Sequence, residues 1–133
     1  MTKGRLLVID DEPDLRDVLV TLLENEASEI VLAANGAEAI SQLESQSFEA
    51  ILSDERMPKK SGLDVLRWLR HRGRDTPFVI HTGYGSRQLY AEAEALNAFG
   101  IIEKPWTEET LVTTVRKALE LGVALKKAVP VRS

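Results

Sequence analysis

Five short apolar runs are the feature that most restricts how this chain can fold. They occupy residues 6–9, 30–33, 50–52, 78–80 and 101–102, and no polar residue interrupts any of them. Most are rich in β-branched side chains. Strands that are buried on both faces of a parallel sheet have this composition, because helices cover both surfaces of such a sheet.

Helical patterns lie between and after these runs. Apolar residues recur at helix spacing over 15–22, 37–43, 63–69, 89–96 and 111–125. Alternating strands and helices form a parallel sheet with helices on both faces, and right-handed crossovers leave few topologies open. We therefore predict an α/β fold with a doubly wound five-stranded parallel sheet of flavodoxin-like strand order 2-1-3-4-5.

Length and composition narrow the class of protein further. The 133 residues suffice for one domain with one core, and the net charge of −4 disfavours nucleic acid as the main partner. The absence of cysteine excludes a disulfide framework, a thiolate metal site and a cysteine nucleophile. With no apolar run of membrane-spanning length and no signal-peptide pattern, we expect a cytoplasmic location and no membrane contact.

Polar residues follow four of the five predicted strands. Asp10-Asp11 follows the first, Asp54 the third, Thr82 the fourth and Lys104 the fifth. Because ligands of such sheets bind outside the carboxyl ends of the strands, near the point where strand order reverses, these side chains should meet there. Three neighbouring carboxylates repel one another, and their oxygen ligands favour a hard divalent cation, Mg²⁺ before Ca²⁺.

The same residues suit phosphoryl transfer, which depends mainly on positioning and on neutralising charge. An Asp carboxylate can act as the nucleophile and become an acyl phosphate. A lysine and a hydroxyl opposite the cation would hold the remaining phosphoryl oxygens. We therefore predict that Asp54 stands at a strand end because it accepts a phosphoryl group there.

Four motifs resemble the receiver domain of bacterial two-component response regulators. They are LLVIDDEPDLR at 6–16, SDERMPKKSGLDVL at 53–66, HTGYG at 81–85 and EKPWT at 103–107, and the resemblance extends over about residues 4–125. It implies a receiver domain at 1–127, followed by a tail or the start of a linker at 128–133.

The resemblance also implies residue roles. Asp54 corresponds to the phosphoacceptor, and Asp10 and Asp11 to the acidic pair that binds Mg²⁺ together with it. Asp11 would bind the ion directly, Asp10 directly or through water. The backbone carbonyl of Arg56 would be the remaining protein ligand.

Further roles concern the switch. By resemblance, Thr82 supplies the hydroxyl that moves to the phosphoryl group, Lys104 pairs with that group, and the bond to Pro105 is cis. Ile101 stands where the family often has an aromatic residue whose rotamer follows the threonine. Displacement of Thr82 is still expected, whereas coupling through an aromatic ring is not.

The lifetime of the acyl phosphate should depend on Arg56 and Tyr84. By resemblance these two positions flank the approach of the attacking water, and both carry large side chains here. Neither offers a carboxylate or amide to orient that water, so we predict slow self-dephosphorylation. The opposite outcome follows if Arg56 stabilises transition-state charge as an arginine finger does.

As a receiver, the chain would be a signalling switch and not an enzyme, catalysing only its own phosphorylation and dephosphorylation. The resemblance implies a sensor histidine kinase or phosphotransfer protein as donor, with slower transfer from small acyl phosphates. The surface made by the fourth helix, fifth strand and fifth helix would then control an output domain, an effector protein or a phosphorylation-dependent homodimer. Direct binding of nucleic acid by this domain is not expected.

Competing interpretations exist for the same residues. An aspartyl phosphatase on a similar sheet would carry a second Asp two positions after the first, where this chain has Arg56. A degenerate receiver would lack part of the acidic set, Thr82 or Lys104. Asp10-Asp11 by itself also suits a helix N-cap, and His81 suits a packed or partly exposed strand residue better than a metal ligand.

Two groups of residues are interpreted as structural. Trp68 and Trp106 suit packing, although an exposed Trp106 would also suit a partner interface. A basic run could suggest nucleic acid, but without interleaved aromatic residues a solvated helix end is the better interpretation. Its members are Lys59, Lys60, Arg67, Arg70, Arg72 and Arg74.

Overall fold

Strands and helices alternate strictly along the chain. The structure, a computed structural model, describes residues 3–128. The elements are β1 (Arg5–Ile9), α1 (Pro13–Leu23), β2 (Glu29–Ala33), α2 (Gly36–Ser45), β3 (Ala50–Asp54), α3 (Gly62–His71), β4 (Phe78–Thr82), α4 (Arg87–Ala95), β5 (Gly100–Glu103) and α5 (Glu108–Lys127). Each apolar run is therefore a strand. The tail predicted at 128–133 lies outside the described residues, apart from its first residue.

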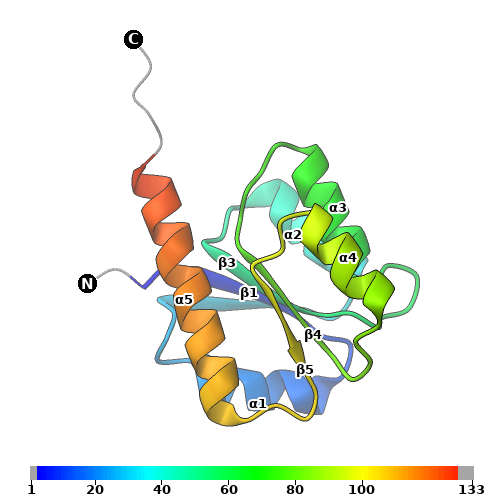
Figure 1. The fold of residues 1–133 in the computed structure, drawn as a ribbon. Coiled ribbons are helices and arrows are strands. Elements are labelled where there is room, and N and C mark those ends of the chain that lie inside the picture. The colour runs from blue at the N-terminus through cyan, green and yellow to red at the C-terminus, as the bar shows by residue number, and fades with distance from the viewer. Residues whose placement is uncertain (1–2, 129–133) are drawn as a thin grey trace.

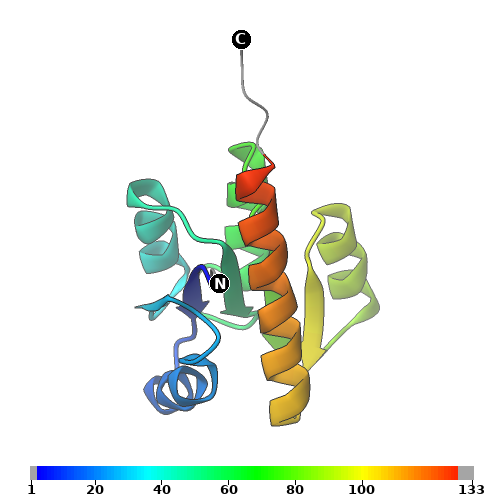
Figure 2. The same ribbon diagram turned by 90° about the vertical axis from the view of Figure 1, so that its left-hand side faces the viewer.

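The five strands form one parallel sheet. Their order is β2-β1-β3-β4-β5, which confirms the predicted doubly wound topology. Helices α1 and α5 cover one face, and α2, α3 and α4 cover the other (Figures 1 and 2). The order reverses between β1 and β3, so the loops that follow these strands diverge and leave room for a ligand.

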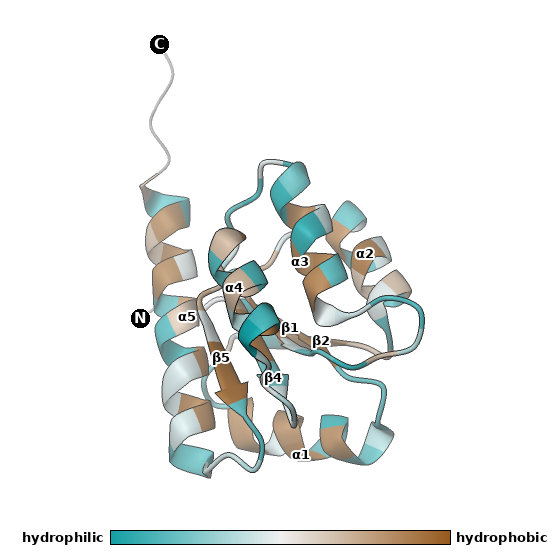
Figure 3. Ribbon diagram, turned by 45° about the vertical axis from the view of Figure 1, so that its right-hand side comes forward, coloured by the Kyte–Doolittle hydropathy of each residue, from teal (hydrophilic) through white to brown (hydrophobic). Residues whose placement is uncertain are grey.

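Alternate strand residues build two separate cores. Leu7 and Ile51 pack with Leu66 of α3, whereas Leu6 and Leu52 pack on the opposite face with helices α1 and α5. Successive strand side chains point to opposite faces, so burial on both sides confines polar residues to the ends of the strands. In Figure 3 the helices carry both hydrophobic and hydrophilic residues, as expected for elements with one face on a core.

Side-chain caps begin most of the helices. The cap residues Ser86 and Thr107 accept hydrogen bonds from the amides of Leu89 and Thr110. Helix α3 begins at Ser61, which forms a reciprocal capping box with Asp64. For α1 the cap position is Glu12, whose side chain makes no capping bond. Helix capping therefore does not account for the acidic pair before α1.

The basic run is only partly a solvated helix end. Half-buried Arg70 donates through Nε to the Leu96 carbonyl, at the end of α4, at 2.8 Å. Arg74 donates through Nη1 to the Leu43 carbonyl of α2 at 2.6 Å. These two arginines satisfy carbonyls at helix ends, where positive charge is also favourable. The prediction that the whole run is solvated was wrong for them.

Both tryptophans are partly buried and pack against the cores, as predicted. The guanidinium of Arg72 lies over the Trp68 ring, 4.6 Å from its centroid.

None of the helices within residues 3–128 combines the length and hydropathy needed to cross a membrane.

Candidate functional site

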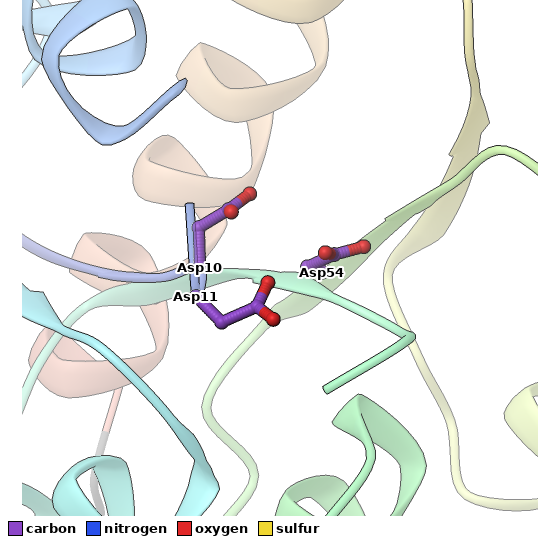
Figure 4. A group of neighbouring side chains, drawn as sticks. All are labelled: Asp10, Asp11 and Asp54. Carbon is purple, nitrogen blue, oxygen red and sulfur yellow. The ribbon is translucent and has the colours of Figure 1, made fainter. Parts of the chain in front are cut away.

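Three carboxylates meet at the carboxyl ends of β1 and β3. Ile9 pairs with Ser53 across these strands, so the next residues, Asp10 and Asp54, lie level with each other. One carboxylate oxygen from each of Asp10, Asp11 and Asp54 lies within 4.8 Å of the other two. Figure 4 shows the three side chains close to one another at the two neighbouring strand ends. The tertiary fold thus assembles the predicted acidic group.

The three carboxylates differ in exposure and in acidity. Asp11 is exposed, whereas Asp54 is 5% exposed and Asp10 is fully buried. Burial raises the pKa of Asp54, and nearby Lys104 opposes that increase only in part. Burial alone would also raise the pKa of Asp10, but the nearby His81 imidazole and the hydrogen bond from the Glu12 amide hold that pKa below its ordinary value.

Lys104 faces the acidic group from the loop after β5. Its Nζ atom lies 3.5 Å from Asp54 Oδ1. The backbone amide of Lys104 donates to the Thr82 carbonyl at 2.7 Å, which ties this loop to the end of β4. The peptide bond between Lys104 and Pro105 is cis. The lysine is therefore positioned by backbone contacts and not only by attraction to Asp54.

Thr82 ends β4 and is almost fully buried. Its Oγ1 atom accepts a hydrogen bond from the Tyr84 amide at 3.1 Å and lies 3.3 Å from the Tyr84 carbonyl oxygen. The hydroxyl is thus engaged by the turn that follows the strand. Movement of Thr82 toward Asp54 requires that these contacts with Tyr84 be exchanged for new ones.

An open pocket of about 490 Å³ lies over these residues. Arg56 and Tyr84 project from the loops after β3 and β4, and the Arg56 guanidinium carbon lies 5.6 Å from the centroid of the Tyr84 ring. The pocket is lined by Asp11, Glu12, Asp54, Arg56, Gly83, Tyr84 and Lys104. The carboxylates of this lining suit a cation, and Lys104 and Arg56 suit an anion, so the pocket could hold both together.

The loop after β3 is held tightly against α3. The Glu55 side chain accepts a hydrogen bond from the Leu63 amide at 2.9 Å, and the Gly62 amide donates to the Glu55 carbonyl at 3.1 Å. A Cβ atom on Gly62 would lie 2.7 Å from the Asp54 carbonyl oxygen. The absence of a side chain at Gly62 therefore lets α3 begin directly against the backbone of Asp54.

Sequence comparison assigns the family. Residues 6–116 match the family model described as the response regulator receiver domain. The chain belongs to this family. It is 32% identical over 118 residues to the transcriptional regulatory protein FixJ of Bradyrhizobium diazoefficiens, covering 89% of this receiver and 58% of FixJ. It is 33% identical over 116 residues to the transcriptional regulatory protein CpxR of Escherichia coli, covering 87% of this receiver and 49% of CpxR.

Solved structures agree with this assignment. The signal receiver domain of a putative LuxO repressor protein from Vibrio parahaemolyticus superimposes with a TM-score of 0.89 at 26% identity, covering 97% of this receiver and 99% of that chain. Full-length FixJ gives a TM-score of 0.82 at 31% identity, covering 96% of this receiver and 63% of that chain. The receiver spans about half the length of the regulators FixJ and CpxR. Receivers are signalling domains, and these two relatives are named as transcriptional regulators.

Ile101 lies away from the acidic pocket of the receiver. It is half-buried on β5 and packs with the core beneath α4. Ile80 and Ile101 are paired across β4 and β5, so their side chains point to the same side of the sheet. Thr82, two residues after Ile80, therefore also faces the same side as Ile101. Ile101 also lines a surface depression with Arg87 and Tyr90 of α4. It therefore shares a face with Thr82 without lining the pocket that contains Asp54.

His81 lies at the site, which could not be expected from its residue type and position in the sequence. It is fully buried, and its Nε2 atom lies 3.3 Å from Asp10 Oδ2. The sequence interpretation, a packed or partly exposed strand residue, was right about packing and missed this contact. The strand register could have placed His81 at the site, because Asp54 and His81 are direct neighbours across β3 and β4.

Proposed function

We propose that this receiver is a Mg²⁺-dependent phosphoacceptor switch, with Asp54 as the acceptor. The observation that carries the proposal is the meeting of three carboxylates and Lys104 in one open pocket. The carboxylates supply a nucleophile and ligands for a cation, and the ammonium group supplies a partner for an anion. A phosphoryl group is the ligand that uses both.

In the proposed reaction, an oxygen of Asp54 attacks the phosphorus of a donor phosphohistidine. The new P–O bond forms as the P–N bond breaks, and the electron pair of that bond stays with the donor imidazole. Lys104, already within 3.5 Å of Asp54, pairs with a phosphoryl oxygen. The Thr82 hydroxyl leaves the Tyr84 backbone and donates to another phosphoryl oxygen.

The donor atoms fit a hard divalent cation. Asp11 and Asp54 would hold Mg²⁺ directly, Asp10 would do so directly or through water, and the carbonyl of Arg56 would complete the protein ligands. When bound, the ion neutralises charge on the phosphoryl oxygens. Asp11 is the exposed member of the group, so it is accessible to an ion from solvent.

The proposed output is the face formed by α4, β5 and α5. Thr82 and Ile101 share the α4 side of the sheet, so inward movement of Thr82 leaves space that Ile101 and α4 can repack to fill. In the cytoplasm, a sensor histidine kinase or phosphotransfer protein would supply the phosphoryl group. The altered face, including Trp106, would control an output domain, an effector or a second copy of the receiver, with residues 1–127 acting as one unit.

Labelling with a small acyl phosphate and Mg²⁺ tests the proposal. Intact mass spectrometry should show one added phosphoryl group that survives acid and is lost in base, as an acyl phosphate is. Asp54→Asn should abolish the adduct, and the matched control Asp75→Asn, an exposed carboxylate before β4, should be labelled as the parent is. Labelling of Asp54→Asn at the parent's level would refute the assignment of the acceptor.

A further inference from the structure

Three polar residues form a row across one face of the sheet. Val8, Leu52 and Val79 belong to the core beneath α1 and α5. Two positions later along the same strands come Asp10, Asp54 and His81, so these side chains point to the same face. His81 is paired directly with Asp54. The apolar core on this side of the sheet therefore ends in a layer of two carboxylates and an imidazole.

The imidazole of His81 reaches past its neighbour to the far carboxylate. Strand β3 lies between β1 and β4, which places Asp10 and His81 about 10 Å apart along the sheet, two strand spacings. Even so, His81 Nε2 lies only 3.3 Å from Asp10 Oδ2, and both side chains are fully buried. The ring therefore spans the width of β3 on the face that α1 and α5 cover.

The two atoms have no alternative partner. Asp10 Oδ1 already accepts a hydrogen bond from the Glu12 amide at 2.9 Å. Among the residues that the structure describes, neither Asp10 Oδ2 nor His81 Nε2 has a hydrogen-bond partner. Their separation of 3.3 Å is long for a hydrogen bond. Buried polar groups nevertheless need partners, so each of these atoms is the partner the fold offers the other.

Donor chemistry fixes the direction of this contact. An ionised carboxylate only accepts hydrogen bonds, whereas a neutral imidazole donates from one nitrogen and accepts at the other. The proton therefore belongs on Nε2. The Glu12 amide holds Oδ1 of Asp10, and Oδ2 faces His81 Nε2, so a hydrogen bond from His81 would fix both oxygens beside Asp11 and Asp54.

We propose that His81 is a positioning residue, whose Nε2–H group holds the Asp10 carboxylate in place for a divalent cation. The inference rests on the proposed function, because it assigns the ion to the acidic group. Groups that orient metal ligands typically change metal affinity about 10- to 100-fold when they are replaced. His81 acts through Asp10 and does not touch the ion.

Two amide variants separate positioning from packing. In His81→Gln the amide nitrogen can occupy the place of Nε2, whereas in His81→Asn it is too short to reach Asp10. We expect Mg²⁺ affinity, measured by titration of backbone NMR shifts, to stay close to the parent in the first variant. It should fall about tenfold in the second. Equal dissociation constants for the two variants would overturn the inference.

Coupling to Asp10 provides a second criterion. In an Asp10→Asn background, His81→Asn should weaken Mg²⁺ binding little further, because the group that it positions is already altered. If His81→Asn lowers Mg²⁺ affinity about tenfold in that background as well, His81 does not act through Asp10. The imidazole ¹⁵N shifts of the metal-free parent should show the proton on Nε2, and a proton confined to Nδ1 would also overturn the inference.

These outcomes are distinguishable from failure of the proposed function. If the parent binds no Mg²⁺, the metal site itself is refuted, and the inference falls with it. If the parent binds Mg²⁺ and Asp11→Ala does not, the metal site stands. Equal binding by the two His81 variants would then remove only the positioning role.

Discussion

The contact between Arg56 and Tyr84 should lengthen the life of the acyl phosphate. Both side chains line the pocket above Asp54, and the guanidinium stacks on the ring. Hydrolysis requires a water in line with the bond between Asp54 and phosphorus. While the stacked pair covers this approach, water is excluded, so replacing Arg56 by Asn together with Tyr84 by Ala should speed dephosphorylation.

The geometry sets the size of the effect. Tyr84 is 66% exposed, so the pair belongs with exposed cation–π contacts, which contribute about 0.5–1 kcal/mol. That energy corresponds to a ratio of closed to open forms of about 2 to 5. If hydrolysis occurs only from the open form, permanent opening should accelerate it about three- to sixfold.

The assay is the decay of the phosphorylated protein after removal of the acyl phosphate donor, followed by intact mass spectrometry. Tyr84→Phe is the matched control, because it keeps the ring and should retain the parent's lifetime. If the double variant loses its phosphoryl group more slowly than the parent, shielding is the wrong account. Arg56 would then assist the reaction by stabilising charge in the transition state.

Three further predictions concern the metal, the switch and pH. Asp11→Ala should abolish Mg²⁺ binding, which should be roughly millimolar in the parent and measurable by tryptophan fluorescence; unchanged binding would refute that ligand. Phosphorylation should alter amide exchange over residues 82–107, and an unchanged pattern would count against the output face. Burial raises the pKa of Asp54, so between the pKa values of the unfolded and folded states the folded protein keeps a proton that the unfolded chain loses. The free energy of unfolding should therefore fall as pH rises through this range. Asp54→Asn should therefore need more denaturant to unfold than the parent near neutral pH, and this difference should disappear below about pH 4. An equal difference at both pH values would show that the charge on Asp54 is not its cause.

The fold could be predicted because its determinants are local and repeated. Each apolar run is too short for a buried helix and lacks polar alternation, so only a strand covered on both faces suits it. The parallel connections then required helices between the strands, and the caps Ser86 and Thr107 could be recognised from residue type alone. The start of α3 was less clear, because the apolar spacing began only at residue 63, whereas the helix begins at Gly62 with Ser61 as its cap.

Part of the site could also be predicted, because residues at strand ends inherit their location from the sheet. Once the strand order was known, Asp10, Asp54 and Lys104 had to lie at one edge, and three carboxylates with a lysine there limit the chemistry. Arg70 and Arg74 could not be assigned in this way. Their partners are carbonyls of helices that lie far away in the sequence, so charge alone suggested solvent.

By itself, the sequence determined the alternation of strands and helices, the edge at which the chemistry lies, and the residue types available there. Only the tertiary structure decided which of these groups touch. Three-dimensional packing stacked Arg56 on Tyr84, engaged the Thr82 hydroxyl with the following turn, and brought His81 across β3 to Asp10. The physical reason is that side-chain contacts depend on strand register, rotamers and the direction in which neighbouring loops diverge. None of these is encoded in the spacing of residues along a single segment.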